Sequence, residues 1–362
     1  MSASSFSGFP ADARILGLDI GSISVDVVLL DGLGTPLYSR YVRHHGQPDK
    51  VLCAELEALE RTHAGIAAAV TGTGADRVGR LLGACAVNEV IAQVAAASFR
   101  CPQARSVIDI GGQDSKYIQL EPAGEGDGLR LKDFSVSSMC ASGTGSFLDQ
   151  QATRLGLDIE TEFGEAALRS RAPARIAGRC SVFAKSDMIH LQQKGTPVED
   201  IVAGLCHALA RSFKANVVGV KALELPVALV GGVAANAGVV KALRSVLHLE
   251  EDGLFVPEDF ALSGAFGAAL FLLGGQGEAV PYKGLAAFRE GLRQRVPMKT
   301  LVPLQPVSVS PPGCRGASDE GPKVSAGFMP PLRPSASSLP DGAGTRGLPG
   351  RPEARIPEGG SP

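Results

Sequence analysis

ILGLDIGSISVDVVLLD, residues 15–31, and SVIDIGGQDSKYIQL, residues 106–120, are two copies of one pattern in this chain. In each copy an apolar strand ends in Asp-Ile-Gly, a short polar turn follows, and a second strand begins. Glycine lets backbone N–H groups approach a ligand closely, and Asp19 and Asp109 stand at the same place in the two copies. The repetition predicts two facing lobes that hold the phosphates and metal ion of a nucleotide between them.

A third glycine turn lies in VALVGGVAANAGVVKAL, residues 227–243, where a strand pattern leads through Gly231-Gly232 into a helical pattern. The N-terminus of such a helix carries free backbone amides that suit an anion or a nucleoside. Two common nucleotide motifs are missing: the sequence has no G-x-x-x-x-G-K-[ST], and no G-x-G-x-x-G leads from a strand into a helix. The P-loop and dinucleotide folds are therefore disfavoured.

The composition narrows the class of protein further. The chain has 362 residues, of which 44% are hydrophobic and 20% charged, with a net charge of −2. This length can bury two lobes, and the near-neutral charge gives no indication of nucleic-acid binding. No apolar run approaches about 18 residues, so no membrane span is expected. Seven scattered cysteines and a polar N-terminus without signal-peptide features favour a reducing compartment, and we expect a cytoplasmic protein.

The order of elements repeats along the chain. Each lobe is predicted to open with a three-stranded meander and to continue with helices. Thr196-Pro197-Val198-Glu199 predicts a capping box at the start of a long amphipathic helix that runs to Val217. A last helix is expected from Glu258 to Leu273, with small residues that permit close packing near a hinge. The expected segments are a flexible N-terminus (1–14), a first lobe (15–104), a second lobe whose final helix returns toward the first (105–275), a C-terminal extension (276–302) and a tail (303–362).

The tail differs from the rest in composition. It holds 13 of the 24 prolines and shows no periodic apolar pattern. Such a segment cannot bury enough surface to offset its ordering entropy, so disorder is expected there.

Two of the cysteines stand in unusual surroundings. Cys140 and Cys180 each come just before a helical pattern, and those patterns end at Gly156 and Gly195. A helix N-terminus lowers the pKa of a thiol and stabilises an anionic metal–thiolate cluster. Two thiolates cannot complete a four-ligand iron–sulfur site, but two copies of the chain can do so across a two-fold axis. The alternative, a small buried hydrophobic residue, is expected for the four cysteines in apolar or unmarked settings, Cys53, Cys85, Cys101 and Cys206.

The run of motifs resembles the ATPase activators of 2-hydroxyacyl-CoA dehydratases and the ATPase subunits of benzoyl-CoA reductase. The resemblance spans residues 15–273. Within it the sequence looks most like the amino-terminal module of the long, multi-domain activators. Those proteins continue with a second activator-like module, whereas a proline-rich tail follows here. The resemblance implies an α/β fold of the actin/Hsp70/sugar-kinase class (ribonuclease H-like), with duplicated lobes and an interlobe nucleotide cleft. The matching stretches are LDIGSISVDVVLLD, NEVIAQ, DIGGQDSK, CASGTGSFLDQQ, GRCSVFAKSDMIHL, VGGVAAN and SGAFGAAL.

The resemblance also implies cofactors and partners. Its members are homodimers in which two cysteines from each subunit, here Cys140 and Cys180, ligate one [4Fe–4S] cluster at the interface. ATP hydrolysis with Mg²⁺ changes the angle of the helices behind the cluster. The cluster then passes a low-potential electron, received from a donor such as ferredoxin or flavodoxin, to a dehydratase or reductase component.

The motifs give each candidate residue of the nucleotide site a role. Asp19 and Asp109 are expected to hold Mg²⁺, directly or through water, and Asp109 to orient the attacking water as well. The residues expected to cradle phosphates are Gly21, Ser22, Gly111, Gly112 and Gln113. Gly143, Thr144 and Gly145 are expected to contact the nucleotide, and Gly231, Gly232 and Asn236 to lie near the nucleoside.

Two other functions remain open from the sequence. A sugar or small-molecule kinase of the same superfamily would use the same turns, but it needs a catalytic aspartate, for which Asp109 and Asp114 are the candidates. A non-catalytic nucleotide-dependent scaffold would bind ATP without turning it over.

Overall fold

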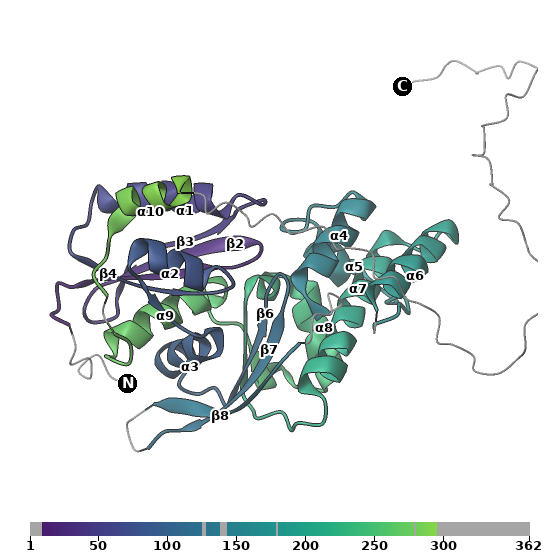
Figure 1. Cartoon of the computed structure of the whole chain (residues 1–362). Coiled ribbons are helices and arrows are strands. Elements are labelled where there is room, and N and C mark those ends of the chain that lie inside the picture. The colour runs from purple at the N-terminus through teal and green to yellow at the C-terminus, as the bar shows by residue number, and fades with distance from the viewer. Residues whose placement is uncertain (1–8, 125–127, 138–142, 179, 279, 295–362) are drawn as a thin grey trace, which may run out of the picture. The chain divides into compact units, whose positions relative to one another are not determined.

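The computed structural model describes residues 9–124, 128–137, 143–178, 180–278 and 280–294. All of them lie in one compact unit that spans Met1–Met298. Within this unit the chain forms two five-stranded sheets with helices around and between them (Figure 1).

The first sheet has the strand order β3-β2-β1-β4-β5. Its first three strands form an antiparallel meander, and β4 and β5 run parallel to β1. All seven residues of β2 are buried, because helices cover both faces of the sheet, and this explains its nearly continuous apolar run. The strands are β1 (Arg14–Ile20), β2 (Ser24–Leu30), β3 (Pro36–Arg43), β4 (Ile66–Thr71) and β5 (Cys85–Ala86).

The second sheet repeats this plan with the order β10-β9-β6-β7-β8. Again a meander of three antiparallel strands is extended by two strands parallel to the first. The equivalence of the two sheets confirms the predicted duplicated lobes. The strands are β6 (Ser106–Ile110), β7 (Ser115–Pro122), β8 (Leu129–Val136), β9 (Val227–Val230) and β10 (Leu254–Phe255).

Helices α1 (Pro48–Glu60), α2 (Ala75–Leu82) and α10 (Gly284–Arg293) cover one face of the first sheet. Figure 1 shows α10 beside α1, although the two are more than 200 residues apart in sequence. Leu285 and Phe288 of α10 are buried against the apolar side chains of α1 and α2. Helix α10 thus completes the core of the first lobe.

Helices α3 (Glu89–Arg100) and α9 (Ser263–Leu273) lie between the two sheets (Figure 1). α9 covers the second face of the first sheet, and α3 contacts both α9 and the second sheet. A Cβ added to Gly267 of α9 would overlap the carbonyl oxygen of Ala92 on α3. The small residues of α9 therefore permit close packing against α3, as the sequence predicts.

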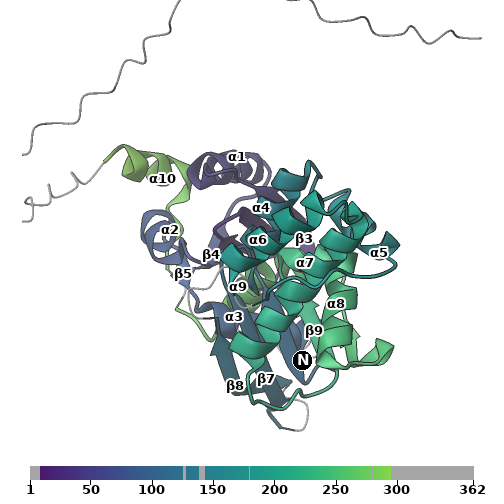
Figure 2. The same ribbon diagram turned by 90° about the vertical axis from the view of Figure 1, so that its right-hand side faces the viewer.

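The outer face of the second sheet is covered by α4 (Gly145–Leu155), α5 (Phe163–Arg169), α7 (Val198–Phe213) and α8 (Ala237–Leu247). α7 is the central helix of this layer and is buried along most of its length. A further helix, α6 (Ser181–Gln193), packs on α7 and is largely exposed (Figure 2).

The predicted helix ends need two corrections. No side-chain capping bond forms at the start of α7 within the described part: Pro197 is the N-cap, and the backbone N–H of Thr196 donates instead to Leu191 in the turn that closes α6, at 3.1 Å. The helix predicted from Glu258 begins at Ser263 as α9, and it is not the last helix, because α10 follows it. Phe260–Leu262 forms a separate 3₁₀ turn, whose first carbonyl accepts a hydrogen bond from the N–H of Gly231 at 2.9 Å.

Candidate active site

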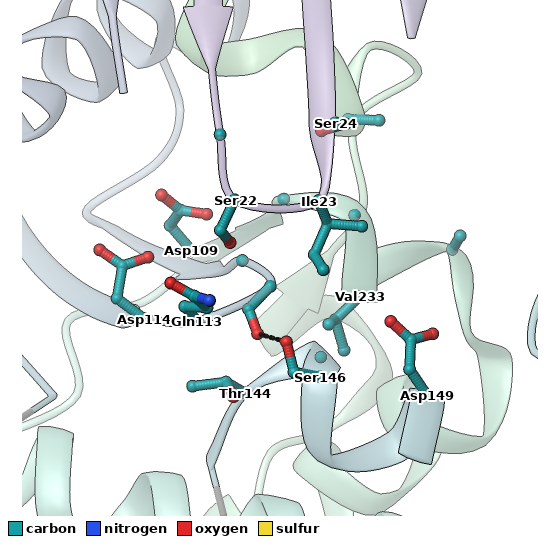
Figure 3. Close-up of a pocket in the computed structure, with 18 of the residues that line it drawn as sticks. Ser22, Ile23, Ser24, Asp109, Gln113, Asp114, Thr144, Ser146, Asp149 and Val233 are labelled. Atoms are coloured by element: carbon teal, nitrogen blue, oxygen red, sulfur yellow. Dashed lines mark hydrogen bonds between the residues drawn. The ribbon is translucent and has the colours of Figure 1, made fainter. Parts of the chain in front are cut away.

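A cavity of about 1140 Å³ lies where the strand ends of the two sheets face each other. Figure 3 shows residues from both lobes around it, with Ser22 and Ile23 opposite Asp109, Gln113 and Asp114. The predicted residues that line the cavity are Asp19, Gly21, Ser22, Asp109, Gly111, Gly112, Gln113, Thr144, Gly145, Gly231, Gly232 and Asn236. Gly143 is outside this lining, Cys180 lies elsewhere, and Cys140 is outside the described residues.

The two Asp-Ile-Gly turns touch across the cavity. A Cβ added to Gly112 would collide with Cγ1 of Ile23 and come within 3.0 Å of Oγ of Ser22. Only a residue without a side chain permits this approach. Backbone amides of both turns are thereby brought to one place, which suits a polyanion such as a nucleotide triphosphate.

Glycines pack against the carboxylates of both strand-end aspartates. Asp19 lies between Gly72 and Gly264, and a Cβ on either glycine would overlap one of its carboxylate oxygens. A Cβ on Gly231 would come within 2.6 Å of Oδ1 of Asp109. The carboxylates therefore occupy the space that a side chain at these glycine positions would fill. The close contact with the glycines restricts the orientation of both carboxylates.

The second turn is bonded to the start of α4. The N–H of Gly145 donates to Gly111 at 2.8 Å, and the N–H of Ser146 donates to Gly112 at 2.9 Å. The Ser146 hydroxyl donates to the same Gly112 carbonyl at 2.5 Å (Figure 3). These three hydrogen bonds connect the turn directly to the N-terminus of α4.

An ion pair also connects the lobes beside the cavity. Arg43 of β3 contacts the carboxylate of Asp149 on α4 at 2.9 Å and that of Glu160 at 3.4 Å. The side chains of Arg43 and Asp149 are partly buried, so salt screens this pair less than a fully exposed pair.

A buried lysine balances part of the negative charge. Lys116 of β7 lies 2.6 Å from Glu89, 2.7 Å from Asp114 and 3.7 Å from Asp109. Burial opposes its charge, but the three carboxylates together raise its pKa above the usual range. One ammonium group cannot neutralise all the acids that surround this part of the cavity, which leaves an excess of negative charge.

Burial, more than this excess charge, raises the pKa values of the carboxylates in the cavity. Burial, followed by the charges of Glu89 and Asp109, raises the pKa of Asp19 to about 7. Burial also raises the pKa of Asp109, against the opposing effect of Lys116. Burial and the charge of Asp19 raise that of Asp26.

Two buried oxygens in this region have no hydrogen-bond partner among the described residues. They are Oδ1 of Asp26 and Oγ1 of Thr71, which belong to strands on either side of Asp19. Unsatisfied oxygens and crowded carboxylates are the donor set that a hydrated Mg²⁺ ion prefers. The residues present therefore fit the predicted metal ion.

The part of the cavity lined by Gly231, Gly232 and Asn236 departs from the simple strand–turn–helix expectation. A 3₁₀ turn, Gly232–Ala235, includes the second glycine and lies between Gly231 and α8. Oδ1 of Asn236 accepts a hydrogen bond from the N–H of Val239 at 3.1 Å and so caps α8 while the residue lines the cavity. A Cβ on Gly232 would come within 2.9 Å of the Tyr41 hydroxyl, which reaches over from the first lobe.

Several lining residues were not assigned a role by the sequence reasoning: Gly72, Glu89, Gln93 and Lys116. Gly72 had a signal, because Thr-Gly-Thr-Gly follows a strand just as Gly231-Gly232 does. Glu89 and Gln93 belong to the quoted NEVIAQ stretch, where Asn88 caps α3 through its Oδ1, 2.9 Å from the N–H of Val90. Their contacts depend on packing between the lobes, which no local pattern reveals.

Cys180 is the N-cap of α6 and is half-buried, as its position before a helical pattern predicts. Val182 and Phe183, in the first turn of α6, are 66% and 65% exposed, so the helix presents an apolar surface next to the thiol. Among the residues that the structure describes, no three or more His, Cys, Asp or Glu side chains are placed to hold a metal ion. Cys101 and Cys206 are buried, as expected, whereas Cys53 and Cys85 are partly exposed.

Within the described ranges, no helix is both long enough and apolar enough to cross a membrane.

Comparison with known proteins places this site in context. Residues 16–271 match the BadF/BadG/BcrA/BcrD ATPase family. The 2-hydroxyisocaproyl-CoA dehydratase activator of Clostridioides difficile is 35% identical over 185 residues, which are 51% of this chain and 66% of that protein. The activator of lactoyl-CoA dehydratase of Anaerotignum propionicum is 32% identical over 260 residues, which are 71% of this chain and 96% of that protein. The first of these alignments spans just under two thirds of the relative's length.

A solved structure extends the likeness to three dimensions. The activator of the 2-hydroxyisocaproyl-CoA dehydratase from Clostridium difficile with bound ADPNP superimposes with a TM-score of 0.63 and 30% identity. The match covers 77% of this chain and 96% of that one. Together with the two equivalent sheets, it confirms the predicted actin/Hsp70/sugar-kinase-like fold.

Proposed function

Because the chain belongs to the BadF/BadG/BcrA/BcrD ATPase family, we propose that it hydrolyses ATP between its lobes to activate an acyl-CoA dehydratase or a related reductase. The finer proposal is that activation consists of the transfer of a low-potential electron from an iron–sulfur cluster. Relatives that carry the name of dehydratase activator support the first part, and the solved relative with ADPNP supports nucleotide binding.

We assign the nucleotide chemistry to the two strand-end aspartates and the turns beside them. Asp19 and Asp109 hold Mg²⁺, directly or through water, and Asp109 orients the water that attacks the γ-phosphate. The amides near Ser22 and Gly112 bind the phosphates, and the Gly231-Gly232 turn lies near the nucleoside. The single observation that carries this proposal is the contact between the two Asp-Ile-Gly turns across a cavity lined by both carboxylates.

We assign the cluster to Cys140 and Cys180, two from each chain of a homodimer. A [4Fe–4S] cluster supplies one-electron chemistry at low potential when it is bound. The position of Cys180 at the N-cap of α6 supports this assignment, since a helix N-terminus stabilises an anionic cluster. The exposed apolar first turn of the same helix supports a partner surface at this place.

The path from nucleotide to cluster runs through α4. This helix begins five residues after Cys140, and its first two residues are bonded to the phosphate turn at Gly111 and Gly112. In this proposal, loss of the γ-phosphate shifts that turn and, through these hydrogen bonds, the N-terminus of α4. The electron donor is of the ferredoxin or flavodoxin kind, and the acceptor is the dehydratase or reductase component.

An anaerobic preparation tests the proposal. The protein should contain about four irons and four sulfides per dimer and should hydrolyse ATP, and an Asp109→Asn variant should fold but lose turnover by about 10²-fold or more. Phosphorylation of a sugar or another small molecule would select the kinase alternative. A folded protein that binds ATP without turnover would select the scaffold.

A further inference from the structure

One buried amide contacts the proposed catalytic carboxylate from a different part of the chain. Gln93 of α3 is 5% exposed, and its Nε2 donates to Oδ2 of Asp109 at 3.1 Å. The hydroxyl of Ser263, the first residue of α9, donates to Oε1 of Gln93 at 2.6 Å. The three side chains therefore form one chain of hydrogen bonds that starts on α9, passes through α3 and ends on β6.

The neighbours of Gln93 fix which way its amide points. A carboxylate oxygen accepts hydrogen bonds only, so the NH₂ group must face Asp109 and the carbonyl must face Ser263. The reversed amide would place its oxygen against Oδ2 of Asp109, with two acceptors in contact and no hydrogen bond to the carboxylate. The ionised carboxylate of Asp109 thus determines the orientation, and the Ser263 hydroxyl, which can donate or accept, donates to the amide oxygen that faces it.

This contact divides the two oxygens of Asp109 between separate tasks. Oδ2 is bound by Gln93 and lies 3.7 Å from the ammonium group of Lys116, which is an ionic contact beyond hydrogen-bond length. Oδ1 points toward Gly231, on the side of the glycine turn. Holding Oδ2 prevents rotation of the carboxylate and keeps Oδ1 available to the metal ion or to water.

We propose that Gln93 is a positioning residue for Asp109, and that the hydrogen bond from Ser263 holds its side chain in place. The proposal rests on the ATP hydrolysis assigned above. Since α9 covers the first sheet while Asp109 belongs to the second, the same contacts make the orientation of the carboxylate depend on how the lobes pack around α3.

The test replaces the donor without changing the volume. In Gln93→Met the side chain has nearly the same length but no N–H, and kcat for ATP hydrolysis should fall by about 10- to 100-fold. The KM for ATP and the affinity for ADP should stay within about twofold, because the phosphate turns are untouched. Gln93→His should restore kcat to within about threefold of the wild type, since a neutral imidazole can accept from Ser263 and donate to Asp109. Ser263→Ala should give an intermediate loss.

A matched control uses another buried glutamine outside the cavity. Gln119 of β7 donates to the Ala222 carbonyl at 2.9 Å, and Gln119→Met should leave kcat unchanged. The inference is overturned if Gln93→Met turns over at the wild-type rate, if Gln93→His is as impaired as Gln93→Met, or if nucleotide affinity falls as much as kcat. Failure of the wild type to hydrolyse ATP would instead reject the proposed function, so the two failures are distinguishable.

Discussion

Gly72 and Gly231 occupy equivalent positions in the two lobes: each follows the strand parallel to an Asp-Ile-Gly strand, with φ of 88° and 85°. A side chain at either position would meet Oδ1 of the neighbouring aspartate, Asp19 or Asp109, and also the backbone of the following isoleucine. The duplication of the two lobes therefore includes the glycine that contacts each carboxylate, as well as the sheets. In both lobes glycine is required by conformation and by space.

The first prediction separates these two requirements. Gly72→Ala and Gly231→Ala should reduce ATP turnover by at least about tenfold, because the methyl group displaces the carboxylate in addition to straining the backbone. Gly46→Ala is the matched control, since Gly46 has φ of 80° but nothing within 4 Å of an added Cβ. It should lose about 1 kcal/mol of unfolding free energy and keep full turnover. Steady-state kinetics and denaturant unfolding measure both effects. Normal turnover in the Gly72 and Gly231 variants would show that the carboxylates tolerate displacement.

The second prediction concerns the pH dependence of stability. The pKa of Asp19 is raised from 3.8 to about 7, so the folded state binds this proton more tightly than the unfolded state does. Its contribution to the unfolding free energy is then largest at low pH and is lost as the pH rises from about 4 to about 7. In nucleotide-free protein with EDTA, Asp19→Asn should therefore gain stability relative to the wild type across this range and change no further above about pH 8.

Addition of Mg²⁺ and ADP should reduce that difference, because a bound cation favours the ionised carboxylate of the wild type. Chemical denaturation at a series of pH values measures the relative stability. A difference between the two proteins that does not change with pH would contradict the raised pKa of Asp19.

The sequence predicted the parts of the fold that have local signals. The two Asp-Ile-Gly hairpins, the meanders and the Gly231-Gly232 turn lie where the apolar patterns and glycines indicate. The two-residue strands β5 and β10 were not expected, because each is defined only by pairing with a neighbouring strand. The start of α7 shows a local motif overruled by its surroundings, since Thr196 is bonded into the turn after α6.

In the candidate site, too, some residues are marked by a local sequence signal and others are not. Asp19 and Asp109 are marked by repetition, whereas the ion pair of Glu89 with Lys116 joins residues 27 positions apart whose meeting depends on the packing of α3 between the sheets. Gln93 reads in the sequence as an ordinary polar residue of an amphipathic helix. Only the position of α9 gives it partners on both sides.

The third prediction concerns α10, which lies beyond the region matched by the family. Phe288 is fully buried, and Oε1 of Glu60 accepts hydrogen bonds from the Tyr282 hydroxyl at 2.8 Å and from the N–H of Leu285 at 2.7 Å. Phe288→Ala should cost about 3–5 kcal/mol of unfolding free energy.

Two shortened chains form the matched pair for this prediction. A chain that ends at residue 302 keeps α10 and should melt at the wild-type temperature, because the composition of the tail cannot support a core. A chain that ends at residue 275 exposes the apolar side chains of α1 and α2 and should melt well below it. Calorimetry measures the melting temperatures. Equal values for the two shortened chains would show that α10 does not contribute to the core. A large drop in melting temperature on deleting residues 303–362 alone would show that the tail has a structural role.

The fourth prediction concerns Cys180. If this thiol and Cys140 are cluster ligands, Cys180→Ser and Cys140→Ser each remove two of the four ligands per dimer, and anaerobically reconstituted protein should retain almost no iron. ADP binding should persist in the Cys180 variant, because Cys180 lies outside the cavity that both Asp-Ile-Gly turns line. Cys53→Ser is the control, since Cys53 is also partly exposed but packs at the core of the first lobe, and it should keep the full iron content. Iron and sulfide analysis with calorimetric titration of ADP measures the outcome. A folded Cys180→Ser dimer that reconstitutes a complete cluster would refute the ligand assignment, whereas loss of ADP binding together with iron would point to general unfolding of the second lobe.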